Sequence, residues 1–383
     1  MDFALAPELQ ALADEAREVG RTATQGRWHH EDSWIAQTDR TFAKELAARG
    51  WLGMTWPTEY GGHGRTALER FVVFEELITQ GAPIAGSWFA DRQMGPTLLQ
   101  FGTDEQRSRW LPGIIAGETM WCIGMSEPDA GSDVASLRTM AVQEDPDDPD
   151  SDWIVNGQKI WNSGGAVAEW CYLIARTDPD APKHKGLSEF IVDMNTPGVS
   201  VVPIRDMTDD EHFCEIYFDD VRVPAAHMVG ELNGSFGQVM RQMEHERGGI
   251  DRLVSNKRLY LDCVEFLRAH DRLDDPLVRD DIARIETGYK IGRLLVLRET
   301  LQQAPRGFSA ATKTFGTEFE IEVSEFCGRA LGAAATLADD GPGRELSRRV
   351  SRNICYAPGY IIMGGTTQIL RNILGDRVLG LPR

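Results

Sequence analysis

One acidic residue lies on an apolar helix face, where a carboxylate could act as a general base. Residues 235–254, SFGQVMRQMEHERGGIDRLV, carry apolar residues at helical spacing: Phe236, Val239, Met240, Met243, Ile250, Leu253 and Val254. Helical stepping from Met243 to Ile250 passes through position 246 or 247, which places Glu246 on this face. Burial among apolar groups raises the pKa of a carboxyl, which brings a base close to neutral pH. The alternative is structural, namely a buried pair of Glu246 with Arg247 or a lateral salt bridge.

The segment SEPDAGSD, residues 126–133, could bind a phosphate or the oxygens of a heterocycle. Gly131 and Ser132 are small enough to let backbone amides approach a ligand, and the hydroxyls of Ser126 and Ser132 add hydrogen-bonding groups. The alternative is a plain surface turn, and composition alone does not separate the two.

Two further short segments carry groups that a ligand could use. In WNSGG, Trp161 offers a flat apolar face two residues before the Ser163 hydroxyl, although a half-buried tryptophan at a strand end is the structural alternative. In MGGTTQILR, Thr366 or Thr367 can cap the helix that follows, and amides at such a helix start can donate to an oxyanion or phosphate. An ordinary capped helix is the alternative there.

The composition excludes several classes of protein. The chain has 383 residues, which predicts two or three domains. Its net charge of −19 and the lack of clustered Lys and Arg argue against nucleic acid and anionic membrane surfaces as partners. No apolar run approaches the roughly 18–20 residues of a membrane helix, and the N-terminus lacks a signal-peptide pattern. Six widely spaced cysteines without a CxxC, and no HExxH, predict reduced packed thiols, no metal site and a cytoplasmic protein.

The elements follow in the order helices, strands, helices. Residues 1–120 carry helical periodicity, with Gly50 ending a helix over 41–49. Short segments rich in β-branched and aromatic residues over roughly 120–225 predict an antiparallel sheet or barrel. The remaining amphipathic stretches predict antiparallel bundle helices over 235–269, 276–303 and 309–338, with a last helix after Thr366. This order excludes a doubly wound βαβ sheet.

Taken together, six segments resemble the acyl-CoA dehydrogenase flavoprotein family: WPTEYGGHG, GTDEQRSRWLPGIIAGE, SEPDAGSD, NGQKIWNSGG, FDDVRVPAAHMVG and GGTTQILRNILGDRVLG. Each is weak alone, but together they follow the order and spacing of the family over nearly the whole chain. The resemblance implies an α+β fold with three domains: an N-terminal helical domain (1–119), a middle antiparallel β-barrel (120–229) and a C-terminal four-helix bundle (230–383). It also implies FAD held between the last two domains and a neighbouring subunit.

The resemblance assigns roles to individual residues. The residues implied to bind FAD are Ile123, Met125, Ser126, Gly131, Ser132, Trp161, Ser163, Thr366 and Gln368. The residues implied to contact the acyl-CoA are Ser132, Met243, Arg247 and Gly365. Ser163 stands where the family often has threonine, a change that keeps the hydroxyl donor.

Two departures from the family pattern matter. Most members carry the catalytic glutamate immediately before the Gly-Thr of the last motif, where this chain has Gly364. A subset similar to the long-chain and isovaleryl branches carries it one residue before an arginine on the first bundle helix, and that residue here is Glu246. Gly364 is still implied to donate its backbone N–H to the thioester oxygen.

The second departure concerns the contact with a partner subunit. The Arg-x-x-Phe-Gly segment of the family is replaced by AHDRLDDPLVRDD (269–281), and a later Gly-Gly element by EFCGRALGAAA (325–335). We therefore expect this chain to complete a partner's FAD site poorly. Some members that act on sterol side chains are two-chain assemblies with one flavin per pair, and this chain fits such a subunit.

The implied reaction is α,β-dehydrogenation of an acyl-CoA thioester to the trans-2-enoyl-CoA. Glu246 takes the α-proton, and flavin N5 accepts the β-hydride. The implied oxidant is an electron-transfer flavoprotein, and the implied assembly is a homo- or hetero-oligomer, either a dimer or a tetramer. Two alternatives remain: a catalytically silent subunit of a heteromeric dehydrogenase, and an acyl-CoA oxidase that passes electrons to O₂.

Overall fold

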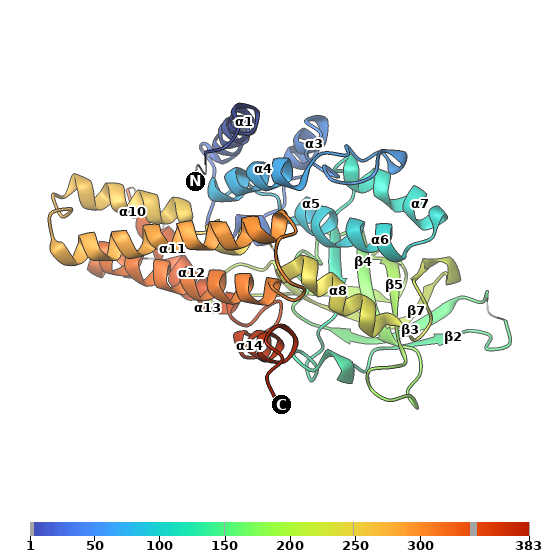
Figure 1. Cartoon of the computed structure of the whole chain (residues 1–383). Coiled ribbons are helices and arrows are strands. Elements are labelled where there is room, and N and C mark those ends of the chain that lie inside the picture. Colours follow the sequence, from blue (N-terminus) through green and yellow to red (C-terminus); the bar gives the residue numbers. More distant parts are fainter. Residues whose placement is uncertain (1–3, 149, 248, 338–342, 383) are drawn as a thin grey trace. The chain divides into compact units, whose positions relative to one another are not determined.

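The computed structural model describes residues 4–148, 150–247, 249–337 and 343–382, without the side chains of residues 242 and 244–247. The order helices, strands, helices is confirmed (Figure 1). The chain divides into two compact units, each assembled from separate stretches of sequence. The first unit comprises residues 1–34, 66–83 and 246–383, and the second comprises residues 35–65 and 84–245.

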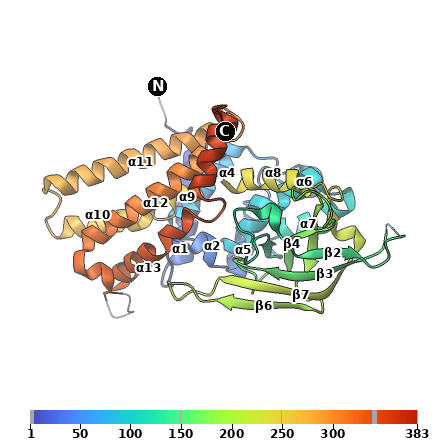
Figure 2. The ribbon, with the colours of Figure 1, turned by 90° about the horizontal axis from the view of Figure 1, so that it is seen from below.

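A four-helix bundle dominates the first unit, as predicted. Its members are α10 (Lys257–Ala269), α11 (Pro276–Thr300), α12 (Ser309–Leu331) and α13 (Glu345–Tyr360), which lie side by side in both views (Figures 1 and 2). The bundle core includes the buried side chains of Leu259, Cys263, Val323 and Phe326. The short helix α14 (Thr367–Ile373) follows the bundle.

Two N-terminal helices belong to the same unit. Helix α1 (Pro7–Thr24) packs on α4 (Ala67–Thr79), and the Arg17 guanidinium donates to both carboxylate oxygens of Glu76 at 2.8 and 2.9 Å. Helix α4 begins with a capping box between Thr66 and Glu69, which satisfies amide groups at its N-terminus. Its start is therefore fixed by local sequence.

The predicted continuous stretch over 235–269 was wrong. The chain forms three helices there: α8 (Ser235–Arg247), α9 (Asp251–Val254) and α10. Gly249 has a φ of +139°, a backbone conformation that L-residues rarely adopt. The glycine that the helical pattern passes over therefore separates α8 from α9.

The second unit holds the remaining helices and the sheet. Its helices are α3 (Arg40–Ala48), α5 (Ala85–Phe89), α6 (Gly95–Phe101), α7 (Asp104–Ile115) and most of α8, while α2 (Ser33–Ala36) lies where the chain passes between the units. Helix α3 ends before Gly50, which has a φ of +67°, so that predicted helix end is confirmed.

Eight strands form one sheet: β1 (Trp121–Gly124), β2 (Met140–Gln143), β3 (Trp153–Lys159), β4 (Trp170–Arg176), β5 (Leu187–Asp193), β6 (Val199–Ile204), β7 (Phe213–Val223) and β8 (Met228–Val229). Their order is β6-β7-β3-β2-β4-β5-β8, with β1 beside β4. The rings of Trp153 on β3 and Phe190 on β5 lie 5.3 Å apart although β2 and β4 separate those strands. The sheet therefore curls around its own core.

The predicted antiparallel pairing holds for most of the sheet, but not for all of it. Strand β1 pairs with β4 in parallel, and one parallel bridge joins Met140 on β2 to Arg176 on β4. Parallel neighbours need a long crossover connection, and the β2–β3 hairpin lies within the segment that joins β1 to β4. Periodicity along single strands cannot reveal such a pairing.

Membrane helices, metal clusters and cysteines were considered from composition, and the described residues bear on all three. No helix in that part is long and apolar enough to cross a membrane. The same residues contain no group of three or more His, Cys, Asp or Glu side chains that could hold a metal ion. All six cysteines are free thiols, and five of them are buried, which confirms the prediction of packed thiols.

Candidate active site

A buried ion pair anchors the SEPDAGSD loop. The carboxylate of Glu127 accepts hydrogen bonds from the backbone N–H groups of Arg138 (2.6 Å) and Thr139 (2.8 Å) and from Lys159 Nζ (2.8 Å). Lys159 is fully buried and also donates to the carbonyl oxygen of Met125 at 3.1 Å. Burial lowers the pKa of Lys159; it would raise that of Glu127, but the charge and hydrogen bonds of Lys159 hold the pKa of Glu127 below its usual value. The loop is thus fixed at its base.

The WNSGG segment lies directly beside the strand that leads into that loop. The Asn162 side-chain amide donates to the carbonyl oxygen of Ile123, and Ile160 N–H donates to the carbonyl oxygen of Ser126 at 2.9 Å. These two bonds bring Trp161 next to the 123–126 segment. The structure therefore gathers the predicted flavin-edge residues of this unit into one region.

Trp161 is held in an exposed and strained position. Its φ is +62° and it is 54% exposed, just beyond the end of β3. A positive φ in a non-glycine residue costs on the order of 1–3 kcal/mol and persists only where neighbours enforce it. Backbone hydrogen bonds between Asn162 and Cys214 in both directions, and from Gly164 N–H to His212 O, enforce it here. The Phe213 ring meets the indole edge to face at 5.7 Å.

The groups around this region fit a flavin. Within the part of the chain that the structure describes, the hydroxyls of Ser126, Ser132 and Ser163 have no hydrogen-bond partner, and each residue is exposed or half-buried. A Cβ added to Gly131 or Gly164 would meet nothing within 4 Å, so space is open beside both. An exposed aromatic face with several available hydroxyls suits an apolar ring system rimmed by polar atoms.

Helix α8 carries the residue predicted to act as base. Its buried positions Ser235, Val239 and Met243 follow one helix face, and Met243 joins an apolar cluster with Ala130 of the SEPDAGSD loop. Glu246 and Arg247 belong to the last turn of α8. Their side chains lie outside the described residues, so their predicted roles stay predictions.

A buried glutamate that the sequence analysis missed holds the start of α8. Glu189 on β5 is 0% exposed, and its carboxylate accepts hydrogen bonds from Tyr172 Oη (2.5 Å) and from Gln238 Nε2 (2.7 Å) on α8. Burial raises the pKa of Glu189 to about 7. The sequence signal was an acidic residue directly before the apolar run FIV of the strand, but its partners are 17 and 49 residues away.

Glu189→Gln is expected to make the protein more stable above pH 7 and to flatten its stability between pH 5 and 8. The pKa of Glu189 is about 7 in the folded chain and 4.5 in the reference state, so folding disfavours its charged form. That cost is absent below pH 4.5, grows as the pH rises, and reaches on the order of 3 kcal/mol above pH 7. Melting temperatures of both proteins at pH 5.5 and 8 test this; an equal pH dependence in the two contradicts it.

The last motif forms a turn of two glycines followed by a capped helix. Gly364 and Gly365 have φ values of +66° and +93°. The sequence offered Thr366 or Thr367 as the cap of this helix. In the structure the cap is Thr366, whose hydroxyl accepts a hydrogen bond from Ile369 N–H at 3.2 Å. Gln368 is exposed on the first turn of α14. The predicted cofactor contacts of this motif thus lie at a helix start.

Comparisons with known proteins identify the family. Models of the acyl-CoA dehydrogenase N-terminal, middle and C-terminal domains match residues 6–118, 122–221 and 233–379. The chain is 33% identical to acyl-CoA dehydrogenase IpdE1 of Mycolicibacterium smegmatis over 351 residues, which cover 90% of this chain and 88% of that protein. The chain therefore belongs to the acyl-CoA dehydrogenase family.

Two solved structures resemble the whole chain. A steroid acyl-CoA dehydrogenase described as Tcur3481-Tcur3483 superposes with a TM-score of 0.90 at 33% identity. The ChsE4-ChsE5 complex from Mycobacterium tuberculosis gives a TM-score of 0.86, also at 33% identity. Each match covers all of this chain and all of the chain it is compared with. The protein is an oxidoreductase that dehydrogenates acyl-CoA thioesters, and the members of its family are flavoproteins.

Proposed function

We propose that Glu246 is the general base of this dehydrogenase and that FAD is its flavin. The observation that supports Glu246 most directly is the buried face of α8, because Glu246 follows the buried Met243 by three residues, about one helical turn. Gly364 supports the same assignment, since the usual position of the glutamate has no carboxylate here. Both residues belong to the first compact unit.

In the proposed mechanism, residues of this chain remove the α-proton of the acyl-CoA and polarise its thioester carbonyl. The α-proton of a thioester is only weakly acidic, so a carboxylate needs help from donors at the developing enolate oxygen. Glu246 takes this proton, while the Gly364 N–H donates to the thioester oxygen. Exclusion of water by bound substrate raises the pKa of Glu246 and matches it better to the carbon acid. FAD, when bound, accepts the hydride from the β-carbon.

The binding residues fall into two sets. We propose that FAD is held by Ile123, Met125, Ser126, Gly131, Ser132, Trp161, Ser163, Thr366 and Gln368. We propose that the acyl-CoA contacts Ser132, Met243, Arg247 and Gly365. Free hydroxyls in the first set supply donors to the flavin ring, and the buried Met243 supplies apolar surface.

The substrate class and the assembly follow from the relatives. The similar solved structures are described as a steroid acyl-CoA dehydrogenase and a complex of two different chains. We infer that the acyl group derives from a steroid and that a second, different chain completes the enzyme. The altered segments 269–281 and 325–335 support a heteromer, because they lack the residues by which family members complete a partner's FAD site. An electron-transfer flavoprotein is the proposed oxidant.

Anaerobic flavin bleaching tests this function. The chain is purified alone and with a co-expressed partner, flavin per chain is measured, and a panel of linear, branched and steroid acyl-CoAs is added without oxygen. Bleaching by steroid acyl-CoAs is the expected result. A colourless chain whose partner alone binds flavin would instead indicate a silent subunit, and stoichiometric hydrogen peroxide on admission of air would indicate an oxidase.

A further inference from the structure

A fully buried lysine touches the glycine turn of the last motif. Lys313 on α12 is 0% exposed, and its Nζ donates to the carbonyl oxygens of Gly365 (2.7 Å) and Tyr360 (3.2 Å). Burying an amino group is unfavourable unless hydrogen bonds replace those to water. An apolar side chain of similar length would fill the same space without that requirement. What distinguishes a lysine at this site is therefore the pair of carbonyl groups that it holds.

The turn that Lys313 contacts contains two consecutive glycines, Gly364 and Gly365. Consecutive glycines have more accessible backbone conformations than any other pair of residues, and both have positive φ here. A hydrogen bond from Thr367 N–H to Ile361 O (3.0 Å) closes the turn across its base. Lys313 adds one bond before the glycines, at the end of α13, and one to the second glycine itself, just before the cap of α14. The lysine thereby ties both ends of the turn to α12.

We propose that Lys313 is a positioning residue for catalysis: it fixes the turn of Gly364 and Gly365 so that the Gly364 N–H meets the thioester oxygen. The inference rests on the proposed function, in which that N–H stabilises the enolate. Loss of one oxyanion donor typically costs about 10²–10³ in rate, and a misplacement of about 1 Å can cost 10². Lys313 acts on the enolate more than on the bound ground state, so its loss lowers the rate constant and leaves substrate affinity nearly unchanged.

Exchange of the α-proton with solvent isolates this step from hydride transfer. The probe is an analogue of the acyl-CoA that best bleaches the flavin, with both β-hydrogens replaced by methyl groups so that it cannot be oxidised. Holoenzyme in D₂O passes the α-proton to Glu246 and returns a deuteron, which mass spectrometry counts. We expect Lys313→Met to slow this exchange about 10²-fold with a probe Kd within threefold of wild type. Infrared spectra of the probe, ¹³C-labelled at its carbonyl, should show a higher stretching frequency in the variant, because the hydrogen bond to that oxygen is weaker.

Thr317→Val is the matched control. Thr317 is also 0% exposed and lies one turn further along α12, where its hydroxyl donates to the carbonyl oxygen of Lys313 at 2.9 Å. The Thr317→Val change removes a buried hydrogen bond from the same helix without altering a contact to the glycine turn. The rate of α-proton exchange and the carbonyl frequency of the probe should therefore match those of wild type. If Lys313→Met does not fold, Lys313→Gln carries the same measurements, with a smaller decrease expected because an amide N–H remains.

The outcomes separate the two proposals. A Lys313 variant with the exchange rate and carbonyl frequency of wild type overturns the positioning role, as does a slowing no greater than that of Thr317→Val. If wild type and Glu246→Gln exchange equally slowly, or if no acyl-CoA bleaches the flavin, the proposed function fails and the role of Lys313 fails with it.

Discussion

The Glu246→Gln enzyme should bind flavin and acyl-CoA as wild type does, yet reduce its flavin about 10²–10⁴ times more slowly. Positioned general bases contribute factors of this size, and glutamine is nearly isosteric with glutamate but cannot accept the α-proton. The measurement is the rate of anaerobic bleaching at saturating acyl-CoA in a stopped-flow instrument. Flavin content and acyl-CoA affinity are measured on the same preparation, so that a loss of binding is not mistaken for a loss of catalysis.

Glu244→Gln provides a control on the same helix. Glu244→Gln removes the same charge two residues earlier in α8, and from the helical period we expect position 244 to lie off the face that Met243 and Glu246 are predicted to share. Its rate of bleaching at saturating acyl-CoA should stay near that of wild type. Bleaching of the Glu246→Gln enzyme at the wild-type rate would exclude Glu246 as the base.

A relocated carboxylate probes the geometry further. If positions 246 and 364 face the same α-carbon, the double variant Glu246→Gly with Gly364→Glu should recover part of the lost rate. Recovery should be incomplete, because Gly364 has a φ of +66°, which is strained for glutamate. A double variant no faster than Glu246→Gly alone would argue against a shared geometry.

The features that could be predicted from sequence depend on interactions between residues close together in the chain. The helix that stops before Gly50, the bundle helices and the capped start of α14 all depend on residues within a few positions of one another. The approach of the WNSGG segment to Ile123 was available only through the family resemblance, because no local pattern links residues 39 positions apart. The chemistry of the site was thus predicted from motifs, and its assembly from the family.

What could not be predicted depends on pairs distant in sequence. In the sequence, Glu189 is only a polar residue within a mostly apolar strand, and nothing near it indicates that Tyr172 and Gln238 donate hydrogen bonds to its carboxylate. The sequence of α12 predicts that Lys313 is one of the exposed charged residues of an amphipathic helix. In the structure it is fully buried and donates to the carbonyl oxygen of Gly365. The break between α8 and α9 was missed for a different reason. The apolar residues keep their helical spacing across it, but the backbone at Gly249 is not helical.

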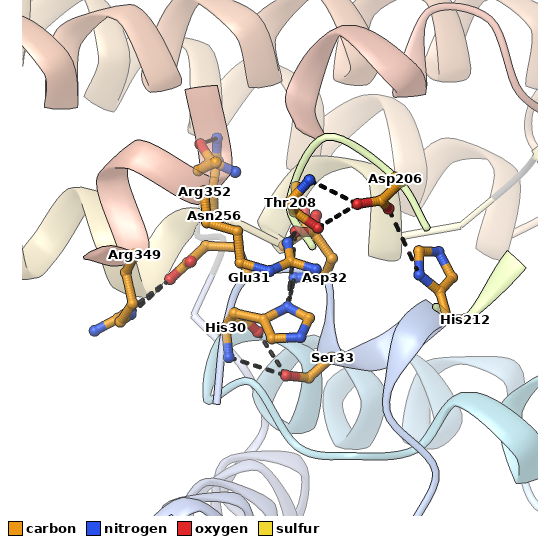
Figure 3. A network of polar contacts seen from close by, with 12 residues as sticks. His30, Glu31, Asp32, Ser33, Asp206, Thr208, His212, Asn256, Arg349 and Arg352 are labelled. Carbon is orange, nitrogen blue, oxygen red and sulfur yellow. Dashed lines mark hydrogen bonds and ion pairs between the residues drawn. The ribbon is translucent and has the colours of Figure 1, made fainter. Parts of the chain in front are cut away.

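Arg352→Met should destabilise the first compact unit by about 3–5 kcal/mol, more than any other single change considered for this unit. Asp32 is 0% exposed and is paired with Arg352 (Figure 3). Tyr360 Oη also donates to the Asp32 carboxylate at 2.8 Å. Removing the guanidinium leaves a buried carboxylate without its cation. Urea unfolding followed by circular dichroism measures the loss, and the double variant with Asp32→Asn should recover much of it because no buried charge remains.

The contribution of Asp32 to stability should depend on pH with opposite signs in wild type and in Arg352→Met. Burial alone would raise the pKa of Asp32, but the charge of Arg352, the neighbouring His30 ring and the hydrogen bond from Tyr360 Oη hold this pKa below its usual value of 3.8. In wild type this pair therefore stabilises fully above about pH 4 and loses its effect as the pH falls through the lowered pKa. In Arg352→Met burial dominates, so the pKa of Asp32 rises and acid relieves the cost by protonating it. The deficit of the variant should shrink as the pH falls towards 5, and a constant deficit would contradict this account.

This network also bears on catalysis, because Tyr360 belongs to both arrangements. Its hydroxyl bonds to Asp32, and its carbonyl oxygen accepts from Lys313, which also holds Gly365. Glu31, next to Asp32 in sequence, forms a second buried pair with Arg349 (Figure 3). Arg349 Nη1 also donates to the carboxylate of Asp262 at 2.7 Å. The end of α13 is thus fixed by buried charge on one side and by Lys313 on the other. Arg352→Met should therefore slow α-proton exchange even under conditions where the variant remains fully folded, whereas Arg21→Met, which alters an exposed ion pair with Glu18, should change neither stability nor exchange.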